Sequence, residues 1–207
     1  MAEYKKISRN KVLLIACGAL AQEILAIKRI GGLNHLELTC LPAQLHLRPD
    51  KIPAEIEKAV KIHRNSFENI FVVYADCGTG GKLQEKCDEL GVGMVKGAHC
   101  YAFFDGLENF EKNSVAELRA FYLTDFLVRQ FESFVWKPLG LDRHPELRDA
   151  YFGNYEKLIY LAQTDDELLD REARRCARRL CLEFERRFTG YGDLPDYLGD
   201  LNLKSNA

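Results

Sequence analysis

Short aliphatic runs alternate with amphipathic helical patterns along the first half of the chain. The run VLLIA at residues 12–16 precedes a segment, residues 19–30, whose apolar positions recur at helical spacing until two glycines end the pattern. The same order then repeats, with further strands or helices predicted over residues 36–41, 53–67, 70–75, 82–90 and near residue 95. Such alternation predicts a parallel sheet that is covered by helices.

The second half of the chain is richer in helical patterns but continues the same plan. Its predicted strands and helices cover residues 121–123, 124–139, 146–152, 157–162, 165–179 and 182–188. We therefore expect one α/β domain over residues 1–207, with a mostly parallel, helix-flanked, Rossmann-like sheet of about five to seven strands. The βα repeats occupy about residues 10–105 and the helix-rich half about residues 106–200, and the tail after Leu203 is expected to be disordered.

Composition and charge narrow the classes of protein to which the chain can belong. At 207 residues it can bury a substantial core, and its 47% hydrophobic and 29% charged residues are typical of a soluble globular protein. The formal net charge of −2 argues against binding to nucleic acid or to an anionic membrane. No apolar window reaches the roughly 18 residues that span a bilayer. Seven irregularly spaced cysteines do not resemble a secreted disulfide framework, so we expect a cytoplasmic protein.

Three of the seven cysteines follow predicted strands at their carboxyl ends. Cys17 follows the first strand, Cys77 follows the strand at residues 70–75, and Cys100 follows the short strand near residue 95. Ligands of parallel α/β sheets bind beyond these strand ends, and right-handed crossovers bring all of them to one edge of the sheet. The loop after the second strand brings His46 to the same edge. Thiols and imidazoles gathered there suit zinc or another soft transition metal.

The predicted ligand set is Cys17 and Cys77 together with one of His99 and Cys100. Neighbouring residues in extended backbone point to opposite sides, so only one of that pair is expected to face the cleft. Three protein ligands and one open position are typical of a catalytic zinc site, although this wide spacing is not itself a zinc motif. Iron and a redox-active dithiol are competing interpretations. His46 is a candidate fourth ligand or acid–base group, or else a solvent-facing loop residue.

The loop DCGTGG at residues 76–81 is the strongest local indication of a ligand-binding site in the sequence. Its glycines allow positive φ and a close approach of the backbone to a ligand, and the next helix would present free N–H groups to an anion. The loop is neither a Walker loop nor a dinucleotide fingerprint. The candidate cofactor-binding residues are those of this loop and of the first strand-to-helix elbow: Gly18, Gly78, Thr79, Gly80 and Gly81. Asp76 is a candidate for proton transfer, and a tight turn without a ligand is the alternative. The other four cysteines are interpreted as packing residues.

Short motifs that are spread over nearly the whole chain resemble those of a known family. They are ACGAL at 16–20, LPA and LH within 41–46, DCGTGG at 76–81, GAHCY at 97–101, LTDFL at 123–127, LGLDRHPEL at 139–147 and TGYG at 189–192. Together they resemble an uncharacterised prokaryotic family, the domain of unknown function 1638. The family carries no established activity, but the resemblance implies an association with corrinoid-dependent methyltransferase systems.

Two classes of function follow from these observations. The first is a metal- or thiolate-dependent protein that binds a small-molecule ligand in a Cys/His/Gly-rich cleft, and an enzyme of methyl-group or corrinoid-linked one-carbon metabolism is the leading example. A metal-bound thiolate stays deprotonated at neutral pH and is therefore a good methyl acceptor. The alternative is a protein without chemistry, either a module that binds a small anion or cofactor, or a partner of a corrinoid protein or methyltransferase.

Overall fold

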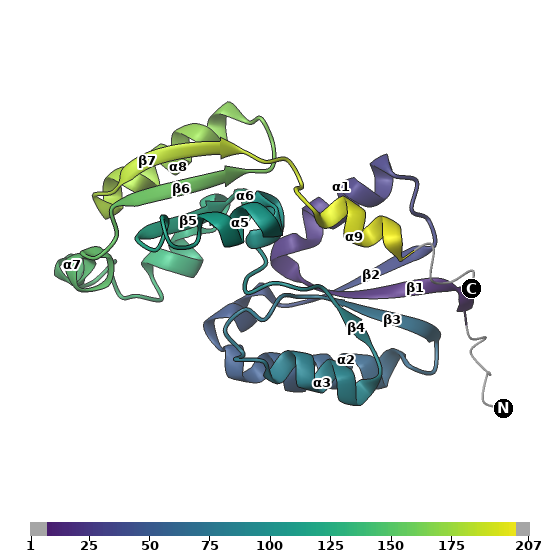
Figure 1. The fold of residues 1–207 in the computed structure, drawn as a ribbon. Helices are drawn as coiled ribbons and strands as arrows, with labels where there is room; N and C mark the ends of the chain where they lie inside the picture. The colour runs from purple at the N-terminus through teal and green to yellow at the C-terminus, as the bar shows by residue number, and fades with distance from the viewer. Residues whose placement is uncertain (1–7, 202–207) are drawn as a thin grey trace. The chain divides into compact units, whose positions relative to one another are not determined.

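The computed structural model describes residues 8–201, which fold into two compact units. The first unit contains the chain up to Cys100 together with the segment from Leu194 onward, and the second contains Tyr101 to Asp193. Each unit has its own parallel sheet with helices, so the predicted α/β class is confirmed (Figure 1). The number of independently folding domains stays a prediction, and the tail after Leu203 lies outside the described residues.

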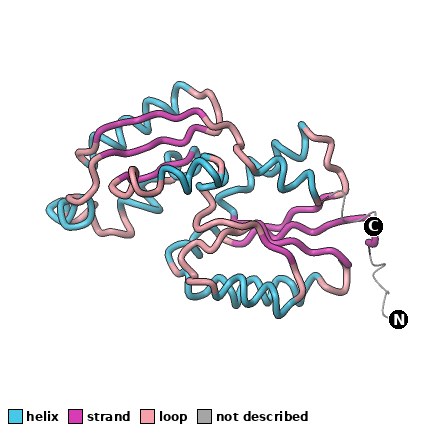
Figure 2. The backbone as a smooth tube through the Cα atoms, viewed as in Figure 1, coloured by secondary structure: helices cyan, strands magenta, loops and turns pink. Residues whose placement is uncertain are grey.

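The first unit is built from alternating strands and helices (Figure 2). In chain order its elements are β1 (Ser8–Cys17), the 3₁₀ helix η1 (Gly18–Leu20), α1 (Ala21–Ile30), β2 (Leu36–Leu41), the 3₁₀ helices η2 (Ala43–Leu47) and η3 (Pro49–Lys51), α2 (Ile52–His63), β3 (Phe67–Val73), α3 (Lys82–Leu90), β4 (Gly93–Met94) and α9 (Leu194–Asp200).

The sheet of the first unit has the strand order β2-β1-β3-β4, and all neighbouring strands are parallel. In Figure 1, α1 and α9 cover one face of this sheet and α2 and α3 cover the other. The chain therefore leaves β1 toward one face and β3 toward the opposite face. This reversal makes the carboxyl ends of β1 and β3 the topological switch point of the sheet, where open α/β sheets bind their ligands.

Burial on both faces explains the apolar composition of the central strands. Leu14 and Ile15 in β1 and Val72 and Val73 in β3 are completely buried, as expected for a parallel sheet between two helical layers. Burying one such side chain contributes about 1.5–3 kcal/mol. The central strands β1 and β3 therefore form a rigid base, and the loops at their carboxyl ends are fixed by it.

The second unit has a three-stranded sheet of order β5-β6-β7, which is also parallel. In chain order its elements are α4 (Ala102–Asp105), α5 (Leu107–Asn113), β5 (Ala120–Thr124), α6 (Asp125–Arg129), the π-helical turn η4 (Glu132–Trp136), the 3₁₀ helix η5 (Pro145–Leu147), α7 (Arg148–Phe152), β6 (Lys157–Ala162), α8 (Glu167–Leu180) and β7 (Glu183–Phe188). Its core forms where α6 and α8 pack on the sheet, around the buried residues Leu123, Val128, Leu158 and Ala173.

Two predictions about the architecture are wrong. The strands do not form one sheet of five to seven, because β5 pairs with β6 and β6 with β7, and β4, with only two residues, ends the first sheet. The predicted helix over residues 124–139 is also interrupted. It ends at Arg129, and hydrogen bonds between residues five positions apart then widen the turn, including the one from Lys137 N to Glu132 O. The wider turn keeps both Phe131 and Val135 buried in the core.

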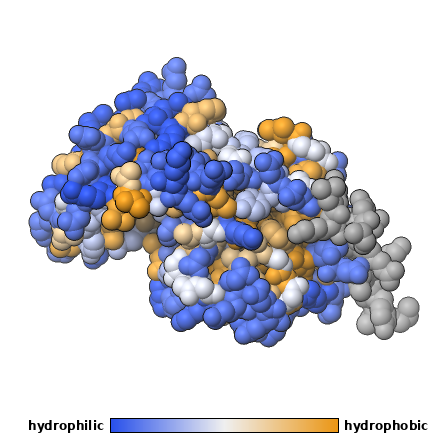
Figure 3. Space-filling view, in the orientation of Figure 1, coloured by the Kyte–Doolittle hydropathy of each residue, from blue (hydrophilic) through white to orange (hydrophobic). Residues whose placement is uncertain are grey.

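The surface that is visible in Figure 3 is mostly hydrophilic, with scattered apolar residues. Single exposed apolar side chains are normal on folded proteins. Among residues 8–201, no helix combines the length and the apolar character that a membrane crossing requires.

Candidate metal centre

The carboxyl edge of the first sheet brings together the predicted site residues Cys17, His46 and Cys77. Cys17 is the last residue of β1, and it lies in register with Leu41 at the end of β2. The chain continues from β2 into η2, which carries His46, while Cys77 lies in the loop after β3. Strand direction and register therefore bring separate parts of the sequence to the switch point between β1 and β3.

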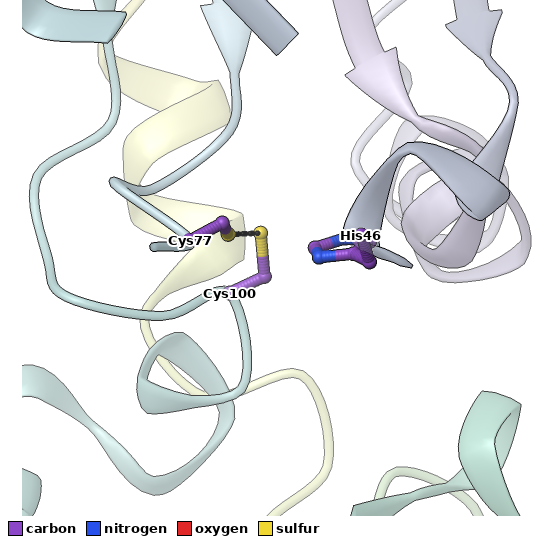
Figure 4. A group of neighbouring side chains, drawn as sticks. All are labelled: His46, Cys77 and Cys100. Carbon is purple, nitrogen blue, oxygen red and sulfur yellow. Dashed lines mark hydrogen bonds between the residues drawn. The ribbon is translucent and has the colours of Figure 1, made fainter. Parts of the chain in front are cut away.

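His46, Cys77 and Cys100 form a compact group of ligand atoms. One ligand atom from each of the three residues lies within 4.8 Å of those of the other two. The sulfurs of Cys77 and Cys100 are 3.2 Å apart, and the imidazole of His46 extends toward them (Figure 4). Cys17 joins the cluster through His46, because its Sγ lies 3.0 Å from Nε2 of the imidazole.

These distances are close to those that a tetrahedral metal requires. Sulfurs bound to zinc at about 2.3 Å lie about 3.8 Å from each other. The two thiols must therefore separate by about 0.6 Å, and no other pair of ligand atoms needs to approach by more than about 1 Å. Side-chain rotations of this size need no change of the fold. The cluster of His46, Cys77 and Cys100 can thus hold a metal ion.

The loop after β3 is shaped by left-handed backbone conformations. Gly78, Gly80 and Gly81 have φ values of 84°, 64° and 86°, and Cys77 itself has φ 49°. A positive φ is unusual for a residue with a β-carbon and is often found at functional sites. The conformation of Cys77 turns the chain sharply at the point where its thiol meets that of Cys100.

Asp76 organises this loop from within. Its carboxylate accepts hydrogen bonds from Oγ1 of Thr79 at 2.6 Å, from N of Gly80 at 3.1 Å and from N of Gly81 at 2.7 Å. Burial opposes ionisation, but these hydrogen bonds outweigh it and hold the pKa of Asp76 below its ordinary value. The N–H groups of Gly80 and Gly81 therefore already have a negatively charged partner, which weakens the case for an external anion at this loop.

The segment before Cys100 runs alongside the start of the same loop. N of Asp76 donates to O of Gly97 at 3.0 Å, and N of Cys77 donates to O of Ala98 at 2.9 Å. These two backbone hydrogen bonds fix the position of Cys100 against Cys77. Cys100 is the member of the His99–Cys100 pair that belongs to the ligand group. His99 lies within electrostatic reach of both Asp76 and His46.

The hydrogen bond between the two adjacent thiols moves their pKa values in opposite directions. The hydrogen bond between them lowers the pKa of Cys77 against the effect of burial, and the same bond together with burial raises the pKa of Cys100. Burial raises the pKa of the Cys17 thiol to about 12. Burial, with the nearby His99, lowers the pKa of His46, which keeps its imidazole neutral and able to bind a metal.

Tyr74 is a site residue that sequence reasoning missed. It follows β3 directly, it is completely buried, and its ring stacks on His46 at a centroid distance of 6.3 Å. Its buried hydroxyl makes no hydrogen bond of standard geometry among the described residues. Burial, together with the thiol of Cys17 beside the hydroxyl, raises the pKa of Tyr74. The available signal was a phenol at the end of a strand that is otherwise aliphatic, because a buried hydroxyl normally has a partner.

Gly18 allows the segment that carries His46 to approach β1. A β-carbon at position 18 would lie 3.0 Å from O of Leu41 and 3.3 Å from N of Ala43, both in the backbone that leads into η2. Gly18 therefore has a packing role beside the cluster. Its predicted role as a cofactor-binding residue, like that of the 78–81 loop, stays a prediction.

The substitution Gly18→Ala is expected to lower the free energy of unfolding by about 1–3 kcal/mol, because the added methyl group overpacks a contact with backbone atoms. Urea denaturation followed by circular dichroism measures this change. Gly199→Ala is the matched control, since a β-carbon there has no neighbour within 4 Å. An equal loss of stability in both variants would contradict the packing role of Gly18.

The four remaining cysteines do not belong to this group of ligand atoms. Cys87 and Cys176 are buried within helices α3 and α8, which confirms their interpretation as packing residues. The same interpretation is wrong for Cys40 and Cys181, which are exposed. Cys40 lies on the edge strand β2, and Cys181 ends α8 in a left-handed conformation that turns the chain outward.

Comparison with known families matches the chain to a family model. The family model described as "Protein of unknown function (DUF1638)" covers residues 40–198. Comparisons with curated proteins and with solved structures gave no match. The matched range includes His46, Cys77 and Cys100, whereas Cys17 precedes it.

Proposed function

The chain belongs to the DUF1638 family of proteins of unknown function, and we propose that it binds a zinc ion through His46, Cys77 and Cys100. The observation that carries this proposal is the convergence of one imidazole and two thiols, from three separate segments, within 4.8 Å of one another. Two thiolates and one neutral imidazole match the ligand types that zinc prefers. The two negative charges would balance the charge of the ion inside the protein.

The electrostatic repulsion between the thiolates of Cys77 and Cys100 also favours a bound cation. Two adjacent buried thiolates repel each other, and without a cation one of them is kept protonated. A divalent ion removes this conflict because it stabilises both thiolates at neutral pH. Zinc is favoured over harder ions such as magnesium, which bind oxygen ligands.

Three protein ligands leave a fourth position for a small molecule. The ring of Tyr74 stacks on His46, and its buried hydroxyl lies beside the thiol of Cys17 without a hydrogen bond of standard geometry, so it is a candidate donor to a group bound at that position. We therefore propose that the fourth position accepts water or a small ligand that binds through sulfur or oxygen.

An open zinc position would make such a ligand more reactive. Zinc lowers the pKa of bound water and keeps a bound thiol deprotonated. Methyl-group or one-carbon chemistry, with a corrinoid protein or a methyltransferase as partner, stays a prediction that rests on the resemblance of the sequence. The alternative of a small-anion module at the glycine loop has less support, because the N–H groups of Gly80 and Gly81 donate to Asp76.

Zinc stoichiometry and affinity test the proposal directly. Protein purified without oxygen is expected to bind one zinc per chain by elemental analysis and by competition with a chromogenic chelator. Cys77→Ser and Cys100→Ser are each expected to weaken zinc binding by at least about 100-fold, because loss of even an outer partner of a metal site costs about 10–100-fold.

Cys40→Ser is the matched control, because it removes an exposed thiol outside the cluster. This variant is expected to bind zinc like the wild type. Circular dichroism of every variant checks that the fold is kept. A folded wild-type protein that binds no zinc, or a Cys77→Ser variant that binds it as tightly as wild type, would refute the proposal.

A further inference from the structure

Cys77 and Cys100 also have the geometry from which a disulfide can form. Both residues are buried, both are free thiols, and their sulfurs lie 3.2 Å apart. A disulfide requires about 2.05 Å, so the sulfurs need to approach by about 1.2 Å. We propose that Cys77 and Cys100 form a reversible disulfide, and that this disulfide and the bound metal are mutually exclusive states of one site. The mutual exclusion of disulfide and metal rests on the proposed function.

The backbone holds the two cysteines in place for this reaction. Hydrogen bonds from Asp76 to Gly97 and from Cys77 to Ala98 join the two segments immediately beside the thiols. The remaining gap between the sulfurs is small beside the range that side-chain rotation covers. The left-handed conformation of Cys77 aims its side chain at the second segment instead of along its own strand.

The other five cysteines are less suited to pairing. Cys87 and Cys176 are enclosed in helices α3 and α8, and Cys40 and Cys181 are exposed on other elements. Cys17 lies against the imidazole of His46. The structure therefore favours one particular pairing, between Cys77 and Cys100.

Hydrogen peroxide is a sufficient oxidant, and the reaction balances in two steps. One thiolate sulfur attacks a peroxide oxygen, the S–O bond forms, the O–O bond breaks, and the departing hydroxide takes a proton to become water. The other sulfur then attacks the sulfenic sulfur, the S–S bond forms, the S–O bond breaks, and a second water leaves. The two cysteines lose two electrons and two protons in total, and the peroxide gains them. A small thiol reverses the bond by two exchange steps, in which it is itself oxidised to a disulfide.

Oxidation removes two of the three metal ligands. The electron pairs and negative charges that bind the ion belong to thiolates, and a neutral disulfide offers neither. His46 alone holds a divalent ion weakly, so the ion is released when the disulfide forms. The same two sulfurs thus either bind the metal or bind each other.

Peptide mapping tests the disulfide without reference to the metal. Metal-free protein is treated with a small excess of hydrogen peroxide, alkylated, and cleaved with trypsin without reduction. Because trypsin cuts after Lys82 and Lys96, Cys77 and Cys100 fall on separate peptides, with Cys87 on a third. We expect the first two peptides to be joined and to separate again after reduction. A Cys17–Cys77 bond, or sulfinic acids without a cross-link, would overturn the pairing.

Zinc release tests the mutual exclusion. Peroxide is expected to free one zinc per chain from the zinc-loaded protein, and reduction is expected to restore binding. Cys40→Ser should behave like wild type, while Cys100→Ser and Cys100→Ala should form no internal cross-link. Zinc that stays bound to the disulfide form would overturn the exclusion. A disulfide in a protein that never binds zinc refutes the proposed function alone, and tight zinc binding with thiols that resist oxidation refutes the disulfide alone.

Discussion

Zinc is expected to protect the first unit against unfolding, and this protection is expected to disappear when Cys77 or Cys100 is replaced by serine. Free zinc at 1000 times the dissociation constant adds about 4 kcal/mol to the free energy of unfolding when only the folded state binds. The three ligands come from separate segments that meet in the folded unit, so the unfolded chain has no preformed site. The slowest amides of β1 and β3 should therefore exchange about 1000-fold more slowly with zinc.

Amide hydrogen exchange with mass spectrometry is the appropriate measurement because it resolves the two units. Trp136, the only tryptophan, belongs to the second unit, so its fluorescence does not report on the first. Cys40→Ser is the control variant and should keep the full effect of zinc. Equal protection of wild type and Cys77→Ser would mean that zinc binds somewhere else.

The location of this site could be predicted because it depends on topology that leaves a clear pattern in the sequence. The aliphatic run before Cys17 and the apolar strand before Cys77 identify two strand ends, and the rule for parallel crossovers puts those ends on one edge. The structure agrees, and it adds that these two strands flank the switch point. A strand order cannot be derived from periodicity alone, since each strand has the same pattern wherever it lies in the sheet.

The identity of the third ligand could not be predicted for a local reason. The expectation that His99 and Cys100 point to opposite sides assumes extended backbone. It does not specify which of the two side chains faces the cleft. Residues 97–99 instead form bends and Cys100 begins a turn. The carbonyl groups of Gly97 and Ala98 accept hydrogen bonds from Asp76 and Cys77, which lie some twenty positions earlier. A long-range contact of this kind has no signature in the segment itself.

The division into two sheets also could not be predicted from the sequence pattern, because strand periodicity does not specify the partner of a strand. The run at 121–123 has the composition of a sheet strand, but β5 pairs with β6 and not with β4. The two-residue β4 exposes too little backbone to extend the first sheet further. A polar anchor then fixes the ends of β5 and β6 together, and this anchor is Asp125.

The substitution Asp125→Ala is expected to lower the free energy of unfolding of the second unit by about 3–5 kcal/mol. Asp125 is completely buried, and its carboxylate accepts hydrogen bonds from the hydroxyl of Tyr160 at 2.7 Å, from N of Gln163 at 3.0 Å and from N and Oγ1 of Thr164 at 3.1 and 2.5 Å. Alanine would leave the buried donors of Tyr160 and Gln163, and the partly buried donors of Thr164, without this partner. Urea denaturation followed by the fluorescence of Trp136, which lies in the same unit, measures the loss.

Asp149→Ala is the control that separates the loss of the hydrogen bonds of Asp125 from the general effect of removing an acidic side chain. Asp149 lies in the same unit, its side chain is 74% exposed, and its ion-pair partner is Arg148. Exposed ion pairs contribute about 0–1 kcal/mol, so this control should unfold close to wild type. Asp125→Asn should fall between the two, because the amide keeps one acceptor oxygen for the donors of β6 and its loop. If Asp125→Ala and Asp149→Ala unfold at the same urea concentration, the carboxylate of Asp125 does not hold β5 and β6 together.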